Sequence, residues 1–234
     1  MDVRGRVNSI ETLGALDGPG IRTVIFLQGC PFTCGYCHNP DTWDENGGTE
    51  YSASELFKKI LRYVPYYKKH GGVTLSGGEP LWQTDFAAEI FRLCKEKGIN
   101  TTLDTSAAIF NKKVKNVLSY TDLIIADVKA LDRGHFKEIC GGSFNVFKKF
   151  LNYCREVGKR VWFRQVIIGS VNDTPSNILA IKDLAAAYNN VEKIELLAYH
   201  TDGLGKWQAL GREYPLRKAQ APIEQTMVDL RNLL

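Results

Sequence analysis

The sequence predicts an α/β fold with parallel strands in a single domain. Short runs rich in β-branched residues alternate with segments of helical hydrophobic periodicity along the 234 residues. Strands that are joined by crossover helices pair in parallel with right-handed connections, which indicates an α/β barrel or an open sheet. No internal repeat, low-complexity tract or linker interrupts residues 1–234, so we expect one domain.

The expected strands span residues 22–28, 72–75, 100–104, 123–127, 160–168 and 193–197. The first helix should follow a capping box made by Ser52 and Glu55. Its apolar face would consist of Leu56, Ile60, Leu61 and Val64. Further helices are expected at 84–97, 112–118, 143–157 and 176–188, two of which precede a glycine typical of helix ends, Gly98 and Gly158.

Composition and charge exclude several classes of protein. The chain is 44% hydrophobic but has no apolar run near the roughly 18 residues of a membrane span. Its net charge of +4 is spread over lysine doublets with acidic residues between them, so we expect no nucleic-acid partner. Residues 1–8 are polar, and we therefore expect no signal peptide and a cytoplasmic location. The six cysteines of such a protein are not expected to form disulfides.

The cysteines fall into two groups. Cys94 and Cys154 lie on the apolar stripes of expected helices, so we expect them in the core. Cys140 precedes two glycines in a turn-like stretch, and free cysteine is most often simply buried. The other three cysteines lie within eight positions, in a loop at residues 28–41.

Cys30, Cys34 and Cys37 form a Cys-x3-Cys-x2-Cys motif. A structural zinc site, which is the alternative, needs four closed ligands, and His38 is poorly placed for that role because it adjoins Cys37. A cubane iron–sulfur cluster takes cysteine thiolates, and three of them leave one iron open. The motif therefore favours a [4Fe-4S] cluster with a free coordination site, where chemistry can occur.

The motif resembles that of the radical S-adenosylmethionine (SAM) superfamily, with Tyr36 at its aromatic position. Other segments resemble the family of pyruvate formate-lyase activating enzymes, and they follow in order over nearly the whole chain. They are DGPGIR at 17–22, YCHNPDTWD at 36–44, GGVTLSGGEP at 71–80, LDTS at 103–106, DVK at 127–129 and VEKIELLAYH at 191–200. This resemblance implies a partial (β/α)6 barrel.

The candidate residues follow the expected strands, at the carboxyl ends where parallel folds gather functional groups. By the resemblance, Gly77, Gly78 and Glu79 would hold the methionine amino group of SAM, Lys129 would face a carboxylate, and Tyr36 would contact adenine. An ordinary strand-to-turn glycine pair and a structural histidine are the alternatives for Gly77-Gly78 and His200. The full set implied to bind SAM is Tyr36, His38, Asn39, Gly77, Gly78, Glu79, Asp104, Lys129, Arg164, Val166 and His200.

Asp104, Thr105 and Asp127 form an oxygen-rich set at neighbouring strand ends, and oxygen ligands suit a hard cation. The resemblance implies a monovalent cation at these residues and at the main-chain carbonyl of Ile125. The alternative is that the carboxylates cap helices or pair with Lys129.

The resemblance also implies an activity: reductive cleavage of SAM, then removal of a hydrogen atom from a backbone glycine of a large partner, a glycyl radical enzyme such as pyruvate formate-lyase. Flavodoxin or ferredoxin would supply the electron, and the chain alone would be a monomer. Residues 17–22 resemble the family's peptide-binding edge, and an ordinary turn before the first strand is the alternative. Trp207 and Tyr214, in the long segment after His200, are expected to cover the site or contact the partner.

Two alternatives stay open. The chain could activate another glycyl radical enzyme, although many such activases carry a cysteine-rich insertion, which is missing between Cys37 and Ser52. It could instead be a non-catalytic iron–sulfur electron carrier, which would need a fourth cluster ligand.

Overall fold

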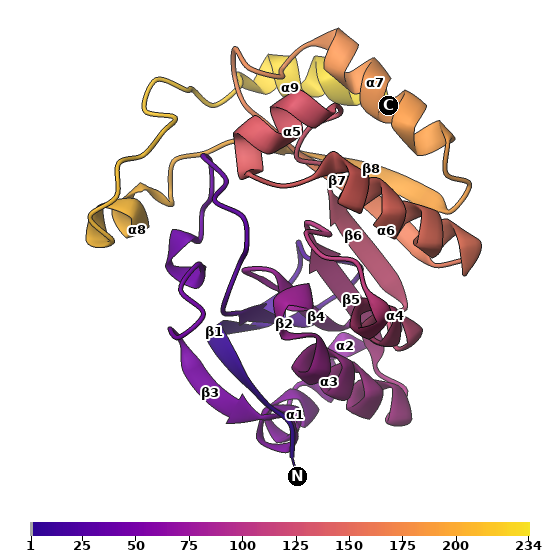
Figure 1. Ribbon diagram of the computed structural model, residues 1–234. Coiled ribbons are helices and arrows are strands. Elements are labelled where there is room, and N and C mark those ends of the chain that lie inside the picture. Colours follow the sequence, from indigo (N-terminus) through magenta and orange to yellow (C-terminus); the bar gives the residue numbers. More distant parts are fainter. Residues whose placement is uncertain (1) are drawn as a thin grey trace. The chain divides into compact units, whose positions relative to one another are not determined.

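The computed structural model describes residues 2–234, which form two compact units (Figure 1). The first unit comprises residues 2–31 and Thr42–Ile125, and the second comprises Phe32–Asp41 and Ala126–Leu234. None of the helices within residues 2–234 has the length and hydropathy that a membrane-spanning segment requires. The single domain that the sequence suggests stays a prediction.

The strands follow the order β3-β1-β2-β4-β5-β6-β7-β8. Their bounds are Arg4–Gly14 for β1, Arg22–Leu27 for β2, Thr49–Ser52 for β3, Gly72–Gly77 for β4, Asn100–Thr105 for β5, Leu123–Asp127 for β6, Arg160–Ile167 for β7 and Val191–Ala198 for β8. As expected, β2 pairs with β4, β4 with β5, and β7 with β8 in parallel. The fold is thus an α/β fold with a mostly parallel, unclosed sheet.

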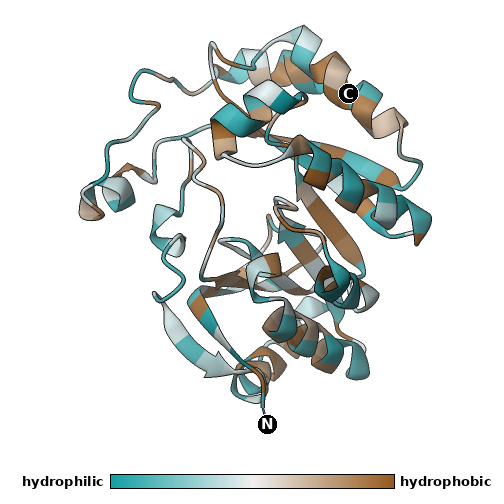
Figure 2. Ribbon diagram, viewed as in Figure 1, coloured by the Kyte–Doolittle hydropathy of each residue, from teal (hydrophilic) through white to brown (hydrophobic). Residues whose placement is uncertain are grey.

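All the strands expected from the sequence are present, but two others were missed. Strand β1 pairs with β2 and β3 in antiparallel fashion. Figure 2 shows the contrast that made the central strands recognisable: β6 is hydrophobic along most of its length, and its residues are almost all buried. Strand β1 instead alternates between buried and exposed residues and carries charges, so its sequence lacks a continuous apolar run.

In the first unit, helix α1 (Ala53–Leu61) begins at the predicted capping box. The Ser52 side chain accepts a hydrogen bond from the Glu55 N–H, and the Glu55 carboxylate accepts one from the Ser52 N–H at 2.8 Å. The prediction that the same helix face continues to Val64 is wrong, because α1 ends at Leu61 and a short helix, α2 (Val64–Tyr67), begins with Pro65 in its first turn. Proline lacks the N–H that would continue a helix.

Two further helices of this unit, α3 (Thr84–Glu96) and α4 (Lys112–Ser119), confirm the predicted segments. A short 3-10 helix, η2 (Pro80–Gln83), precedes α3, and Cys94 is fully buried on α3, as expected.

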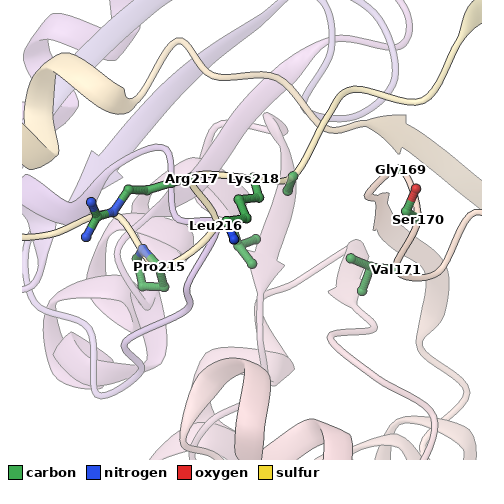
Figure 3. A pocket seen from close by; sticks show the side chains of 8 residues that line it. Gly169, Ser170, Val171, Pro215, Leu216, Arg217 and Lys218 are labelled. Carbon is green, nitrogen blue, oxygen red and sulfur yellow. The ribbon is translucent and has the colours of Figure 1, made fainter.

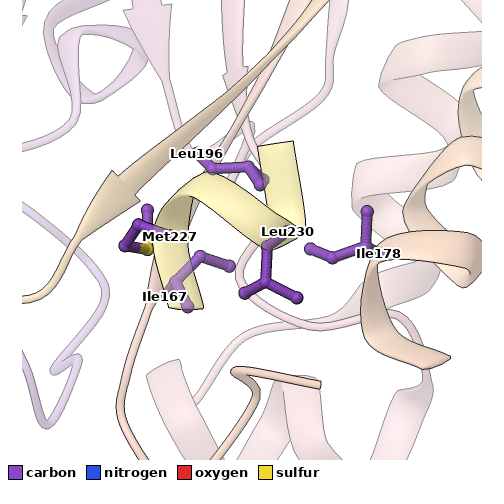
Figure 4. Close-up of a cluster of buried hydrophobic side chains, with 5 residues drawn as sticks. All are labelled: Ile167, Ile178, Leu196, Met227 and Leu230. Atoms are coloured by element: carbon purple, nitrogen blue, oxygen red, sulfur yellow. The ribbon is translucent and has the colours of Figure 1, made fainter. Parts of the chain in front are cut away.

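The second unit contains α5 (Arg133–Cys140), α6 (Phe144–Glu156), α7 (Pro175–Ala186), α8 (Leu204–Ala209) and α9 (Glu224–Arg231). Helices α6 and α7 confirm predictions, and Cys154 is buried on α6. Cys140 does not lie in a turn: it is the last residue of α5, and the turn begins one residue later at Gly141, whose φ of 74° ends the helix. One core cluster of this unit joins β7, α7, β8 and α9 (Figure 4) through Ile167, Ile178, Leu196, Met227 and Leu230.

A buried arginine fastens residues 17–22 to the sheet of the first unit. The Arg22 side chain is fully buried, and burial lowers its pKa to about 10, so it remains charged at neutral pH. Its guanidinium donates hydrogen bonds to the main-chain oxygens of Pro19 and Val73, both at 2.9 Å, and to Thr74 Oγ1 at 2.7 Å. Thr74 Oγ1 in turn donates to the main-chain oxygen of Asp17 at 2.6 Å. Arg22 therefore orders the turn that precedes β2.

Replacing Arg22 by methionine should lower the stability of the chain. Removing the donor leaves the buried Val73 carbonyl and the partly buried Pro19 carbonyl without it, at about 1–3 kcal/mol for each unsatisfied group. We expect a loss of about 3 kcal/mol in the free energy of unfolding by urea of the cluster-free chain. Arg4→Met is the matched control, because Arg4 makes an exposed ion pair with Glu50. Equal effects of the two substitutions would contradict the role of Arg22.

Candidate active site

The candidate residues fall in both units, so each set is described within its own unit. In the second unit, Phe32–Asp41 forms the segment that carries Cys34 and Cys37, which we call the cysteine loop. Cys34 is buried and Cys37 is partly buried, and the Cys37 N–H donates to the Cys34 carbonyl at 3.0 Å. Cys30 lies in the first unit, three residues after β2 ends at Leu27. None of the six cysteines, all of which lie within residues 2–234, forms a disulfide.

The end of α5 holds the cysteine loop through its main chain. The Thr33 N–H donates to the Cys140 carbonyl at 3.3 Å, and the Gly35 N–H donates to the Ile139 carbonyl at 3.2 Å. The Cys140 thiol also hydrogen-bonds to the Cys34 thiol, which lowers the pKa of Cys34 and raises that of Cys140. Sequence reasoning missed this role of Cys140, because only the tertiary fold brings it beside the loop.

Helix α8 and the glycine before it hold the other end of the cysteine loop. The Trp207 indole N–H donates to the Cys37 carbonyl at 2.8 Å. The Lys206 ammonium donates to Asn39 Oδ1 at 2.8 Å and lies 3.0 Å from Asp41 Oδ1. Trp207 was expected to cover the site or to contact a partner, and its indole N–H binds the loop itself. Lys206 was missed, since a lysine on a short helix gives no signal in the sequence.

Gly203, at the start of α8, lies so close to the loop that a Cβ atom there would be 2.8 Å from the His38 Cα. Only glycine fits this approach. The Trp207 ring also packs edge-on against the Tyr214 ring, with 5.2 Å between the ring centroids. The Tyr214 and Tyr199 hydroxyls are 2.6 Å apart. Buried aromatic packing therefore supports the segment that binds the loop.

The structure brings together two of the predicted residues, His38 and His200. Their ring centroids are 3.9 Å apart, and His38 Nε2 lies 2.9 Å from the His200 carbonyl. Burial lowers the pKa of His38, which favours its neutral form at neutral pH. His200 Nδ1 also lies 3.2 Å from Asp202 Oδ2.

Tyr36 and Lys129 also meet in the second unit. The Lys129 ammonium lies 5.5 Å from the centroid of the Tyr36 ring and 2.8 Å from Asp127 Oδ2, and its side chain is only 12% exposed. The Asp127 carboxylate helps to hold the pKa of Lys129 well above its usual value, so the ammonium stays charged despite its burial. This is the pairing of Asp127 that was the alternative to a cation site.

Arg164 and Val166 lie on β7, as the sequence predicts. The Arg164 guanidinium is buried and pairs with Glu195, with Nη2 to Oε2 at 3.0 Å and Nε to the same oxygen at 3.2 Å. The main-chain oxygen of Arg164 accepts a hydrogen bond from the Val128 N–H at 2.7 Å. This hydrogen bond joins β7 to Val128, the residue that precedes Lys129.

In the first unit, the main chain of neighbouring segments leaves no room for a side chain at Gly77 or Gly78. Gly77 has a φ of 105°, and a Cβ atom there would be 2.4 Å from the Leu27 nitrogen. A Cβ atom on Gly78 would be 2.3 Å from the Gly29 oxygen. The Glu79 N–H donates to that same oxygen at 2.9 Å. The glycine pair therefore lets the end of β4 lie directly against the chain that leads to Cys30.

Glu79 is fully buried and is bonded within its own unit. Its carboxylate accepts hydrogen bonds from the Leu81 N–H at 3.0 Å and the Thr105 hydroxyl at 2.6 Å. It also accepts two from Ser106, from the N–H at 3.0 Å and the hydroxyl at 2.5 Å. Burial raises the pKa of Glu79, while these donors oppose that rise. The carboxylate thus orders the loops after β4 and β5.

The residues predicted to hold a cation are distributed over the strand ends. Asp104 accepts a hydrogen bond from the Ser76 hydroxyl at 2.9 Å, Thr105 bonds Glu79, and Ile125 is buried in β6. Among residues 2–234 the structure groups no three His, Cys, Asp or Glu side chains around one position for a metal ion. The cation site stays a prediction.

The second unit also contains cavities, one of which is lined in part by Lys129. A cavity of about 560 Å³ is lined by Gly169–Val171 and by residues 215–219 (Figure 3), none of which was predicted to bind SAM. A smaller one of about 380 Å³ includes Lys129 together with Asp132, His135 and Gln165.

Comparisons with known proteins give a consistent result. A family model described as a 4Fe-4S single cluster domain matches residues 16–138. The pyruvate formate-lyase-activating enzyme of Clostridium pasteurianum is 46% identical over 220 residues, which cover 94% of this chain and 92% of that protein.

Solved structures agree with the fold. A domain of a pyruvate-formate lyase-activating enzyme from Bacteroides vulgatus superposes with a TM-score of 0.57 at 26% identity, covering 70% of this chain and 92% of that one. SuiB from Streptococcus suis, solved with bound S-adenosylmethionine, superposes with a TM-score of 0.65 at 21% identity, covering 87% of this chain and 43% of that one.

We expect Trp207→Phe to loosen the cysteine loop. The substitution keeps an aromatic ring beside Tyr214 but removes the donor to the Cys37 carbonyl. Loss of one such bond, about 1.4 kcal/mol, corresponds to roughly tenfold faster hydrogen exchange by local opening. Mass spectrometry of the peptide that contains residues 32–41 measures it. Trp162→Phe, on β7 of the same unit, is the control; unchanged exchange in both variants would show that Trp207 does not hold the loop.

Proposed function

Because the chain belongs to the family of pyruvate formate-lyase-activating enzymes, we propose that it activates a glycyl radical enzyme, and that Cys30, Cys34 and Cys37 hold its [4Fe-4S] cluster. When bound, that cluster supplies the electron that cleaves SAM to methionine and a 5′-deoxyadenosyl radical, which takes a hydrogen atom from a backbone glycine of the partner. Pyruvate formate-lyase is the partner that the family implies.

The observation that carries this proposal is the cysteine loop. The thiols of Cys34 and Cys37 in the loop, with that of Cys30 in the first unit, are the donors that iron–sulfur clusters require, and none of the three forms a disulfide. Hydrogen bonds to α5 and α8 hold the main chain of the loop in place. A loop held in this way can wrap around a bulky inorganic group without rearranging the strands. The chemistry of this donor set supports the proposed cluster.

The other residues would act by binding and orienting SAM. The charged Lys129 would attract its carboxylate, and the Tyr36 ring beside Lys129 would contact adenine. Main-chain groups of Gly77 and Gly78 would bind the amino group, with Glu79 fixing the loop that presents them. The remaining proposed contacts are His38, Asn39, Asp104, Arg164, Val166 and His200, and the proposed monovalent cation would lie at Asp104, Thr105, Ile125 and Asp127.

The proposal also includes the electron donor, the oligomeric state and the location of the chain. Flavodoxin or ferredoxin would donate the electron, and the chain alone would be a monomer in the cytoplasm. The absence of disulfides among the six cysteines within residues 2–234 is consistent with a reducing compartment.

The direct test is the formation of a glycyl radical. Anaerobically reconstituted chain, mixed with pyruvate formate-lyase, a reductant and SAM, should give a glycyl radical signal in electron paramagnetic resonance. Cys34→Ala should lose the cluster and the signal, because one ligand is gone. Its far-UV circular dichroism should stay that of the parent, since the loop adds little to the core.

Cys94→Ala is the control, because Cys94 is buried on α3 in the first unit. It should retain both iron and signal. Full activity in Cys34→Ala would refute the ligand assignment. A chain with a cluster that leaves SAM intact under reducing conditions would instead support an electron carrier.

A further inference from the structure

The proposed reaction gives no role to Cys140 or to its contact with Cys34. Three cysteines suffice for the cluster, yet a fourth thiol lies in hydrogen-bonding contact with one of them. Both side chains belong to the second unit, and both are buried. The Cys140 thiol also donates to the Phe136 carbonyl at 3.0 Å, one helical turn earlier.

Main-chain hydrogen bonds on both sides of Cys34 fix this contact. The bonds from Thr33 to Cys140 and from Gly35 to Ile139 hold the two chain segments side by side. Main chains joined by hydrogen bonds lie about 5 Å apart, within the Cα separation of about 4.4–6.8 Å that disulfides need. This close approach, together with the interaction of the two thiols, makes Cys34 and Cys140 candidates for a disulfide.

The turn after α5 is shaped to let the loop approach this closely. A Cβ atom on Gly142 would lie 2.4 Å from the ring of Phe32, and the Phe32 ring packs edge-on against Phe136 at 6.1 Å. The loop and the end of α5 therefore pack closely around the two thiols.

We propose that Cys34 and Cys140 are an oxidative modification site, at which a peroxide joins them in a disulfide whenever the loop lacks its cluster. Cys34, the slightly exposed member of the pair, reacts first: its sulfur displaces water from hydrogen peroxide and becomes a sulfenic acid. The Cys140 sulfur then attacks the Cys34 sulfur, and a second water leaves. One peroxide is thus reduced to two waters, while two thiols lose their hydrogens and form one S–S bond.

The consequence rests on the proposed function, in which Cys34 is a cluster ligand. The disulfide would leave two ligands, so the cluster could not be rebuilt until a dithiol reductant restored Cys34. It would also protect Cys34 from the sulfinic and sulfonic acids, which thiols do not reverse. The chain would be stored in a recoverable form after damage by oxygen.

The test uses the full chain with its iron removed anaerobically by a chelator. After treatment with one equivalent of hydrogen peroxide and alkylation of the remaining thiols, peptide mapping should find the peptides of Cys34 and Cys140 joined, with the mass of two hydrogens lost. Reconstitution with iron and sulfide but without thiol reductant should then fail, and dithiothreitol should restore it. A Cys34–Cys37 link, or no link, would overturn the proposal.

Cys140→Ser and Cys140→Ala test the partner thiol, and Cys154→Ser, a buried cysteine of α6, is the matched control. Without peroxide, both Cys140 variants should reconstitute to the iron content of the parent. After peroxide they should recover less iron even with dithiothreitol, because Cys34 is oxidised further. Loss of the cluster from untreated Cys140 variants that keep the parent's circular dichroism would make Cys140 a fourth ligand and overturn the proposal.

The two proposals fail differently. The disulfide is identified by mass alone, in a chain without iron, and needs neither SAM nor a partner. If the peptides are joined but reconstituted chain makes no glycyl radical, the proposed function fails and the modification site stands. If the radical forms but the peptides stay separate, only the modification site fails.

Discussion

The cysteine loop depends on hydrogen bonds from segments far along the sequence. Residues 32–39 form no helix or strand, so their polar main-chain groups need partners elsewhere. The end of α5 supplies carbonyls to Thr33 and Gly35, and Trp207 on α8 supplies a donor to Cys37. The positions of Cys34 and Cys37 are therefore set by residues about a hundred or more positions later. A change that weakens α5 or α8 should therefore also affect the segment that carries these two thiols.

The same principle governs the charged groups near the loop. Lys129 is paired with Asp127, and Arg164 with Glu195, and all these pairs are largely buried. A buried charge without a partner is costly, whereas a paired one is held in a fixed position. The chain thus keeps a charged ammonium beside Tyr36 in a site that water reaches poorly. Such fixed charges suit the binding of an ionic cofactor, because little reorganisation is required when it arrives.

Much of this organisation was predictable from local sequence. Continuous apolar runs, such as that of β6, predict the central strands. Ser52 and Glu55 predict the start of α1. The spacing of the three-cysteine motif favours an iron–sulfur cluster, and the resemblance of the surrounding segments indicates the family. Strands β1 and β3 were missed because their alternating, charged sequences resemble loops. The end of α1 was misplaced, since apolar periodicity continues to Val64 although Pro65 starts a new turn.

Other features required the tertiary fold. Nothing near Cys140 in the sequence indicates that it meets Cys34, and Lys206 gives no sign that it binds Asn39. Glu79 was expected to serve SAM, while its four hydrogen bonds serve the loops after β4 and β5. Contacts between segments distant in sequence decide these roles, and periodicity and spacing do not encode them.

The central claim is a cluster held by three thiolates with one iron open to SAM. Mössbauer spectroscopy of chain reconstituted with ⁵⁷Fe, before and after SAM is added, tests it most directly. The account predicts that a single iron site of the cluster changes its isomer shift when SAM binds, while the other three keep theirs. A spectrum in which SAM alters no iron site, because a fourth protein ligand already fills the open position, would contradict it.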